Sequence, residues 1–222
     1  MKAIILAAGL GQRMGALTQA IPKPLLEVGD RPLIVHHIER LVAAGINELV
    51  INHARHADQF HALLGDGSSI GADIVFSSEG DQPLGTAGGI LKALPALGQH
   101  PFIVLNADLW TAFPFETLAV ESPALAHLIL VPNPSHHPNG DFGLDTGYVS
   151  INNYRSFTYA GIGCYRPELF AACRPGTTEL APLLSAAAAQ GQVSGTLYSG
   201  VWLDVGTPER LAEANTLYAD SH

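Results

Sequence analysis

The sequence predicts an α/β protein, a three-layer sandwich around a mixed, mostly parallel, Rossmann-like sheet. Short apolar runs typical of fully buried strands alternate with stretches of helical period along the first half of the chain, which favours parallel strands covered by helices on both faces. Two glycine-rich loops each follow such a run, at the carboxyl end of a strand, where open α/β sheets bind ligands. A length of 222 residues, 47% of them hydrophobic, suffices for one domain with a full core.

The first half of the chain provides four apolar runs and three helical patterns. The expected strands cover residues 3–6, 48–51, 72–76 and 101–108. The expected helices cover a segment from Pro32, which suits a first turn, to a stop at Gly45, then residues 58–64 and about 90–94.

The second half of the chain is less regular. Residues 128–131 form another expected strand, and a polar loop rich in turn formers follows over 132–143. Alternating apolar and polar residues over 147–151 and 156–165 predict an antiparallel pair at one edge of the sheet. The remaining expected elements are a helix over 179–190, a short strand around 201–204 and a helix that begins at Pro208, capped by Thr207.

Composition restricts the partners and the compartment. Acidic residues number 20 against 11 basic ones, and the resulting formal net charge of −9 disfavours nucleic acid as a partner. No apolar run approaches the roughly 20 residues that a membrane helix needs, and the chain enters its first strand without a signal peptide. We therefore expect a cytoplasmic protein that does not bind membranes. Cys164 and Cys173 lack metal-ligand spacing and are expected to be reduced thiols.

The first glycine-rich loop has the residues of a phosphate cradle. Gly9 and Gly11 allow positive φ and a close approach of backbone N–H groups to a ligand, and Arg13 and Lys23 bring two cations to the same loop. The spacing matches neither a P-loop, since no Gly-Lys-Ser/Thr follows, nor a complete dinucleotide fingerprint. Taken by itself, Gly-x-Gly is better explained as an ordinary strand-to-helix turn.

The second glycine-rich loop covers residues 77–89 and contains the run Pro-Leu-Gly-Thr-Ala-Gly. Small residues of this kind fit either a tight packing turn or a ligand that the backbone approaches closely. The position of the loop, at the carboxyl end of the strand over 72–76, favours the ligand.

Two aspartates lie at the carboxyl ends of predicted strands. Asp108 ends the run over 101–108, and Asp204 follows Trp202-Leu203. A carboxylate at the solvent end of a buried strand can hold a hard cation such as Mg²⁺ through oxygen, although aspartate also commonly caps turns. If the two side chains converge, they can chelate Mg²⁺ against a phosphate. The ten histidines show no ligand spacing, so we assign no metal to them.

Three blocks of the sequence together resemble the sugar-1-phosphate nucleotidyltransferases, or nucleotide-sugar pyrophosphorylases. Residues 6–24 fit the family's opening pattern LAAGxGxRMxPxTxxxPKP, with Ala16 where the family usually has proline. Residues 83–88, PLGTAG, look like its base-recognition segment. Residues 202–211, WLDVGTPERL, match its W.DVGTPERL block.

The resemblance implies the nucleotide-diphospho-sugar transferase fold, with separate segments of the chain for nucleotide binding and for sugar binding. A single domain would cover residues 1–222, with a nucleotide-binding part over about 1–110 and a sugar-binding part over about 111–206.

Roles for individual residues follow from the same resemblance. The implied nucleotide-binding residues are Ala8, Gly9, Gly11, Gln12, Arg13, Lys23, Glu79, Gly85 and Thr86. The implied sugar-phosphate-binding residues are Asn106, Asp141, which belongs to a stretch of the form NPxHHxxGDF, and Gly161. The implied catalytic residues are Arg13, Lys23, Asp108 and Asp204, the two aspartates also holding Mg²⁺ as cofactor.

The implied reaction is attack by the phosphate oxygen of a sugar 1-phosphate on the α-phosphorus of a nucleoside triphosphate, with release of pyrophosphate. Arg13 would neutralise the leaving pyrophosphate, and Lys23 would bridge the α-phosphate and the sugar phosphate. The short length, the HHPNGDF loop and the WLDVGTPERL ending resemble most the branch of the family that uses UTP and N-acetylmuramate α-1-phosphate in cell-wall recycling.

Two alternatives stay open at this point. Glu79 before Pro-Leu-Gly-Thr-Ala-Gly also occurs in mannose-1-phosphate guanylyltransferases, which use GTP. Some relatives have become non-catalytic nucleotide-sensing modules, although Arg13, Lys23, Asp108 and Asp204 are all present here. Either way we expect a monomer or a small homo-oligomer.

Overall fold

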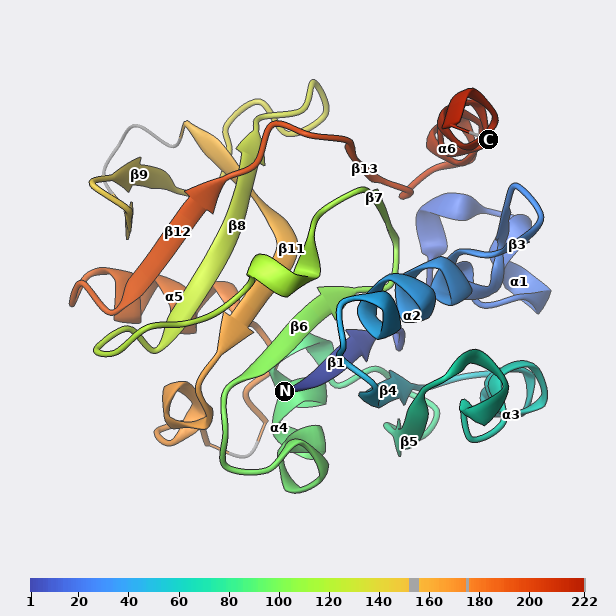
Figure 1. The fold of residues 1–222 in the computed structure, drawn as a ribbon, viewed down its shortest axis with the longest axis horizontal. Helices are drawn as coiled ribbons and strands as arrows, with labels where there is room; N and C mark the ends of the chain where they lie inside the picture. Colours follow the sequence, from blue (N-terminus) through green and yellow to red (C-terminus); the bar gives the residue numbers. More distant parts are fainter. Residues whose placement is uncertain (152–155, 175, 222) are drawn as a thin grey trace.

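A nine-stranded sheet runs through the middle of the computed structural model, which describes residues 1–151, 156–174 and 176–221 (Figure 1). Its strand order is β5-β4-β1-β6-β11-β8-β12-β10-β9. The strands are β1 Lys2–Leu6, β4 Glu48–His53, β5 Asp73–Ser78, β6 Phe102–Asn106, β8 Ala126–Pro132, β9 Gly143–Asp145, β10 Tyr148–Ser150, β11 Phe157–Tyr165 and β12 Val193–Leu197. The pairings give seven strands one direction and oppose only β10 and β11 to them. The expected mixed, mostly parallel sheet is confirmed.

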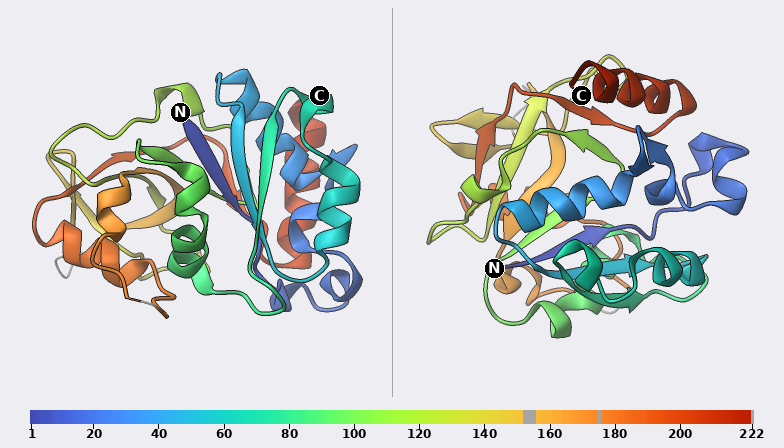
Figure 2. Two further views of the ribbon diagram at one scale, coloured as in Figure 1. Left: turned by 90° about the horizontal axis from the view of Figure 1, so that it is seen from below. Right: turned by 45° about the vertical axis from the view of Figure 1, so that its right-hand side comes forward.

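Helices cover both faces of this sheet, as Figure 2 shows. On one face lie α2 Leu33–Ala43 and α3 Ala57–Leu64, and on the other lie α4 Gly85–Leu97 and α5 Ala181–Ala188. Side chains along a strand point alternately to the two faces, so Ile5 of β1 packs into the first helical layer and Ile4 into the second. Both faces of β1 are therefore buried, which explains its unbroken apolar run. In the described part of the chain no helix is both long and apolar enough to cross a membrane.

A smaller layer holds the C-terminal segment against the rest of the molecule. Strand β13 Trp202–Asp204 pairs with β7 Leu109–Thr111, and α6 Pro208–Ser221 packs over this ribbon and over the hairpin of β2 Glu27–Val28 and β3 Arg31–Pro32. Their shared apolar core consists of Val28, Leu33, Trp110, Leu203, Val205 and Ala214. This core fixes the end of the chain beside the carboxyl end of β6.

Short helical turns complete the described elements. They are η1 Gln12–Met14, α1 Leu17–Ala20, η2 Lys23–Leu25, η3 Ser68–Ile70, η4 Phe115–Thr117 and η5 Pro167–Phe170. The first three belong to the loop that leaves β1 and shape the site described below.

The second glycine-rich loop is shorter than predicted, because α4 begins at Gly85 and not at about residue 90. Gly88 and Gly89 thus lie within a helix. A Cβ added at Gly89 would overlap Glu79 Oε1, and one added at Gly88 would lie 2.9 Å from Leu84 Cβ. The small residues of this segment therefore serve close packing of a helix N-terminus against its neighbours.

The predicted edge pair is wrong. Strand β11 lies in the centre of the sheet between β6 and β8, and β10 pairs with β9 and β12. All but two residues of β11 are buried. Gly161 and Gly163 interrupt its apolar run, so its sequence has the alternating pattern that is typical of a half-exposed strand. Strands β2, β3, β7, β9 and β12 were not predicted, and the strand expected over 101–108 ends at Asn106.

Candidate active site

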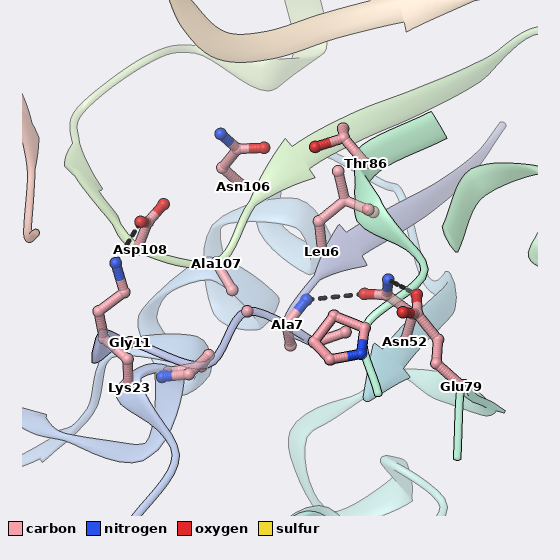
Figure 3. Close-up of a pocket in the computed structure, with 15 residues that line it drawn as sticks. Leu6, Ala7, Gly11, Lys23, Asn52, Glu79, Thr86, Asn106, Ala107 and Asp108 are labelled. Carbon is pink, nitrogen blue, oxygen red and sulfur yellow. Dashed lines mark hydrogen bonds and ion pairs between the residues drawn. The ribbon is translucent and has the colours of Figure 1, made fainter. Parts of the chain in front are cut away.

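A pocket of about 250 Å³ opens at the carboxyl ends of β1 and β6 (Figure 3). Its walls come from the loop after β1, the end of β4, the segment between β5 and α4, and the turn after β6. The lining residues are Leu6, Ala7, Ala8, Gly9, Gly11, Lys23, Pro24, Asn52, Glu79, Pro83, Gly85, Thr86, Asn106, Ala107 and Asp108. Both glycine-rich loops therefore face the same space.

Gly11 gives the first loop its tight shape. Its φ of 63° lies in the left-handed region, and its carbonyl accepts hydrogen bonds from Met14 N (2.8 Å) and Thr18 Oγ1 (2.8 Å). A Cβ at Gly11 would lie 3.0 Å from Thr18 Cγ2, whereas Gly9 has open space on its Cβ side. The loop is thus closed against the protein at Gly11 and open toward the pocket at Gly9.

Lys23 is the cation of this pocket. The residue is only 9% exposed, and its Nζ forms an ion pair with Asp108 Oδ2, which Figure 3 shows at one side of the pocket. A buried ammonium group needs such a partner, because desolvation without one costs several kcal/mol by general estimates. The pair joins η2 to the turn after β6, across 85 positions of sequence.

Asp204 is the last residue of β13, and β13 pairs with the strand that follows the turn of Asp108. The β13–β7 register places Asp204 opposite Leu109, and Val205 N donates a hydrogen bond to Asp108 O (2.7 Å). The Asp204 side chain is paired with Arg210 and with His136 Nε2 (3.0 Å). It lines a neighbouring hollow of about 500 Å³ and not the pocket that Asp108 lines. The structure thus places the two backbone segments side by side, but the carboxylate of Asp108 pairs with Lys23 and that of Asp204 with Arg210.

Arg13 and Arg210 meet at Gly206. A Cβ added there would lie 3.2 Å from Arg13 Nη2 and 2.5 Å from Arg210 Nη2. The exposed Arg13 side chain therefore reaches Gly206, two residues after Asp204, although Arg13 does not line the first pocket. Two guanidinium groups at one turn form a local positive region in a chain of formal net charge −9.

A buried hydrogen-bonded chain closes the opposite side of the pocket (Figure 3). Ala7 N donates to Asn52 Oδ1 (2.7 Å), Asn52 Nδ2 donates to Glu79 Oε1 (2.6 Å), and Leu84 N donates to Glu79 Oε2 (2.6 Å). Asn52 is 3% and Glu79 is 7% exposed. Both oxygens of the predicted nucleotide ligand Glu79 are thus engaged by the protein.

A second pocket of about 930 Å³ adjoins the first. The two share Pro83, Gly85, Thr86 and Asn106 as lining residues. The second pocket extends over Asp141, Tyr159 and the start of α5. Two of the residues predicted to bind the sugar phosphate, Asn106 and Asp141, therefore line it.

Asp141 is held in place by two contacts. Its Oδ2 accepts a hydrogen bond from Tyr159 N (2.9 Å), and its Oδ1 lies 3.0 Å from His137 Nε2. Gly161, with φ 74°, lies under Asn106, because a Cβ there would come within 2.6 Å of Asn106 Nδ2. Asn106 and Asp141 therefore line the second pocket, and Gly161 supports it from below.

Gln12, like Arg13 and Asp204, is a predicted site residue that lines neither of these two pockets. It lines a separate hollow on the other side of the first loop, with Arg55 and His56. Residue His37 of α2 is buried near Asp108, and burial lowers its pKa to about 4, so it adds no positive charge under the site near neutral pH.

Sequence patterns missed three residues of the site: Asn52, His136 and Arg210. Asn52 was detectable as the polar residue that ends the buried strand over 48–51, and Arg210 as the cation of the WLDVGTPERL block. His136 belongs to the HHPNGDF loop, but only the fold shows that this loop reaches Asp204.

The chain is similar to known proteins in both sequence and fold. The family model described as "Nucleotidyl transferase" matches residues 2–221. An N-acetylmuramate alpha-1-phosphate uridylyltransferase from Neisseria meningitidis serogroup B is 46% identical over 98% of both chains. Another protein of that name, from Caulobacter vibrioides, is 35% identical over 96% of this chain and 97% of its own. A crystal structure of a putative glucose-1-phosphate thymidylyltransferase from Bacillus anthracis superposes with a TM-score of 0.88, at 23% identity, over 99% of this chain and 96% of its own, and so shares the fold.

Proposed function

Because this chain belongs to the nucleotidyl transferase family, we propose that it transfers a uridylyl group from UTP to N-acetylmuramate α-1-phosphate, forming UDP-N-acetylmuramate and pyrophosphate. The chain is a sugar-1-phosphate nucleotidyltransferase. The observation that carries the choice of substrates is the 46% identity to a uridylyltransferase of that specificity over 98% of both chains. A role in cell-wall recycling, in the cytoplasm, would follow from these substrates.

The two joined pockets fit two substrates that react at their junction. In this proposal the nucleoside triphosphate lies against both glycine-rich loops in the first pocket, and the sugar lies in the second, beside Asp141. Asn106 and Thr86 line both pockets and would border the reacting phosphates. Nucleotidyl transfer requires positioning and charge neutralisation more than covalent help from the protein.

Three cations supply that neutralisation. Lys23 Nζ faces the first pocket, where it would bridge the α-phosphate and the incoming sugar phosphate. Arg13 and Arg210, at the turn of Gly206, would stabilise the negative charge that develops on pyrophosphate as it leaves. Such fixed cations act most strongly where protein excludes water, and the side chain of Lys23 is only 10% exposed.

We propose that Asp108 and Asp204 would hold Mg²⁺ in exchange for their present partners, Lys23 and Arg210, because the pairing of β13 with β7 places the two residues near one another. Among the described residues no group of three or more His, Cys, Asp or Glu side chains could hold a metal ion, so most ligands of a Mg²⁺ ion here would come from phosphates and water. Mg²⁺ in nucleotide enzymes typically binds one or two carboxylates and completes its octahedron with phosphates and water. When bound there, it would polarise the α-phosphate and orient the triphosphate.

A substrate panel tests the proposed function. Purified protein is incubated with UTP, GTP, CTP or dTTP against N-acetylmuramate α-1-phosphate, mannose 1-phosphate, glucose 1-phosphate or N-acetylglucosamine 1-phosphate, and pyrophosphate is measured. We expect UTP with N-acetylmuramate α-1-phosphate to give the highest kcat/KM. A preference for GTP with mannose 1-phosphate would favour the more distant relatives named mannose-1-phosphate guanyltransferases. Binding of UTP without pyrophosphate release with any sugar phosphate would indicate a nucleotide-sensing module.

Replacing Gly161 by alanine is expected to raise KM for the sugar 1-phosphate roughly tenfold and leave KM for UTP nearly unchanged. The new Cβ would come within 2.6 Å of Asn106 Nδ2 and displace that side chain from the second pocket. Initial-rate kinetics with each substrate varied in turn measure the effect.

Gly45→Ala is the matched control. Its φ of 77° is close to the 74° of Gly161, but a Cβ there meets nothing within 4 Å. Both variants should lose about 1 kcal/mol of stability to left-handed backbone strain, and only Gly161→Ala should change sugar binding. Equal kinetic effects of the two variants would contradict a role for Gly161 under Asn106.

A further inference from the structure

The hydrogen-bonded chain through Asn52 and Glu79 connects two backbone positions that belong to different walls of the first pocket. At one end is Ala7, which opens the first glycine-rich loop, and at the other end is Leu84, which precedes α4. The residues that flank Leu84, Pro83 and Gly85, line both pockets. A shift of Leu84 would therefore move the wall that the two substrates share.

The hydrogen-bonded chain from Ala7 to Leu84 has a fixed pattern of donors and acceptors. Its two ends are backbone N–H groups, and between them stand one carboxamide and one carboxylate. Asn52 supplies one acceptor and one donor, and Glu79 supplies two acceptors, so each of the three contacts joins a donor to an acceptor. Turning the Asn52 amide over would point its nitrogen at the N–H of Ala7. The carboxylate at position 79 fixes the orientation of Asn52.

Helix α4 packs tightly against the side chains of Asn52 and Glu79. A Cβ on Gly89 would lie 2.6 Å from Asn52 Nδ2 and would overlap Glu79 Oε1. Asn52 and Glu79 therefore have little freedom to rotate, and the three contacts set the separation of Ala7 from Leu84.

From these contacts we propose that Asn52 and Glu79 form a positioning pair for the nucleotide. In this proposal Glu79 acts through the N–H of Leu84 and the amide of Asn52, and not as a direct hydrogen-bond partner of the base. The pair holds the first glycine-rich loop and the segment 83–86 at the distance that fits a nucleobase. The proposal rests on the proposed function only in naming the nucleotide, since the contacts exist in the protein alone.

Single isosteric substitutions break the pattern. In Glu79→Gln the carboxamide must turn its nitrogen toward Leu84 N–H or toward the Asn52 amide, so two donors face each other in every arrangement. In Asn52→Asp two carboxylates face each other across the contact that measures 2.6 Å in the wild type. We expect each variant to raise KM for UTP roughly tenfold or more and to reduce the preference for UTP over CTP.

The double variant Asn52→Asp/Glu79→Gln restores the pattern with the same number of heavy atoms and the same net charge. The new carboxylate at position 52 then accepts from Ala7 N–H and from the new carboxamide at position 79, and the oxygen of that carboxamide accepts from Leu84 N–H. We expect its KM for UTP and its base preference to return to within about threefold of wild type. An exposed isosteric change, Glu116→Gln, is the control for the substitution chemistry and should leave both quantities unchanged.

A second measurement does not depend on catalysis. Amide hydrogen exchange at Ala7 and Leu84, followed by NMR in nucleotide-free protein, should be slow in the wild type and the double variant and fast in each single variant. A double variant that regains slow exchange but keeps the KM of Glu79→Gln would overturn the proposal, because Glu79 would then contact the base itself. Single variants with wild-type exchange and KM, or a double variant that does not fold, would also overturn it. Failure of the proposed function alone would leave the exchange pattern intact.

Discussion

Asp108→Asn and Asp204→Asn are each expected to lower kcat for nucleotide-sugar formation by about two to three orders of magnitude. Asparagine keeps the shape of aspartate and removes its charge. In the proposed function that charge holds Mg²⁺, and a neutral amide is a much poorer ligand for a hard cation. The rate at saturating concentrations of both substrates should fall more than substrate binding, because the lost interaction acts mainly in the transition state.

Both variants should stay folded. Asp108 lies on a turn and Asp204 at the end of β13, and the pairing of β13 with β7 and the small core under α6 hold both positions through the backbone and apolar side chains. Each substitution removes the charge partner of a largely buried cation, Lys23 or Arg210, so we expect unfolding temperatures to fall by about 5 to 15 °C without loss of the folded state at 25 °C.

The measurements are pyrophosphate release with both substrates saturating, the Mg²⁺ concentration that gives half-maximal rate, and thermal unfolding by circular dichroism. Asp73→Asn, an exposed change at the start of β5 and thus at the opposite end of the sheet, is the matched control. Near-normal turnover in both site variants would show that these carboxylates do not hold the metal. If only one variant loses turnover, that aspartate is the protein ligand of the metal, and the other aspartate serves only in its ion pair with Lys23 or Arg210.

The local chemistry of the site could be predicted from the sequence, because it lies in short contiguous segments. Gly11 with its positive φ and the two glycine-rich loops that face one pocket follow from motifs at strand ends. The parallel half of the sheet could be predicted for the same reason, since fully buried strands leave unbroken apolar runs.

The parts that could not be predicted depend on contacts between distant segments. No local pattern shows that β13 pairs with β7, and this pairing is what brings the Asp204 turn to the Asp108 turn. The central place of β11 was missed because glycines that support Asn106 and fit under Tyr165 break its apolar run. Glu79 was expected to bind the nucleotide directly, and only its contacts with Asn52 and Leu84 suggest a different role.

Lys23→Met is expected to lower kcat/KM for both substrates by about two to three orders of magnitude. Methionine fills nearly the same volume as lysine at this buried position but cannot donate a hydrogen bond to a phosphate. Lys23 is the cation that lines the first pocket among the described residues, so Arg13 and Arg210, at the neighbouring turn, cannot replace it at the α-phosphate. The substitution also leaves Asp108, whose side chain is 28% exposed, without its ion pair.

Two effects of Lys23→Met can be separated by experiment. If Lys23 served only to neutralise Asp108, the double variant Lys23→Met/Asp108→Asn would be no worse than Asp108→Asn alone. If it contacts phosphates, as we propose, the double variant should lose a further factor of about ten or more, because each side chain then has its own partner in the transition state. Initial rates for wild type, both single variants and the double variant complete this cycle, with the exposed Lys92→Met as control. Identical rates for Asp108→Asn and the double variant would confine Lys23 to the role of a counter-ion.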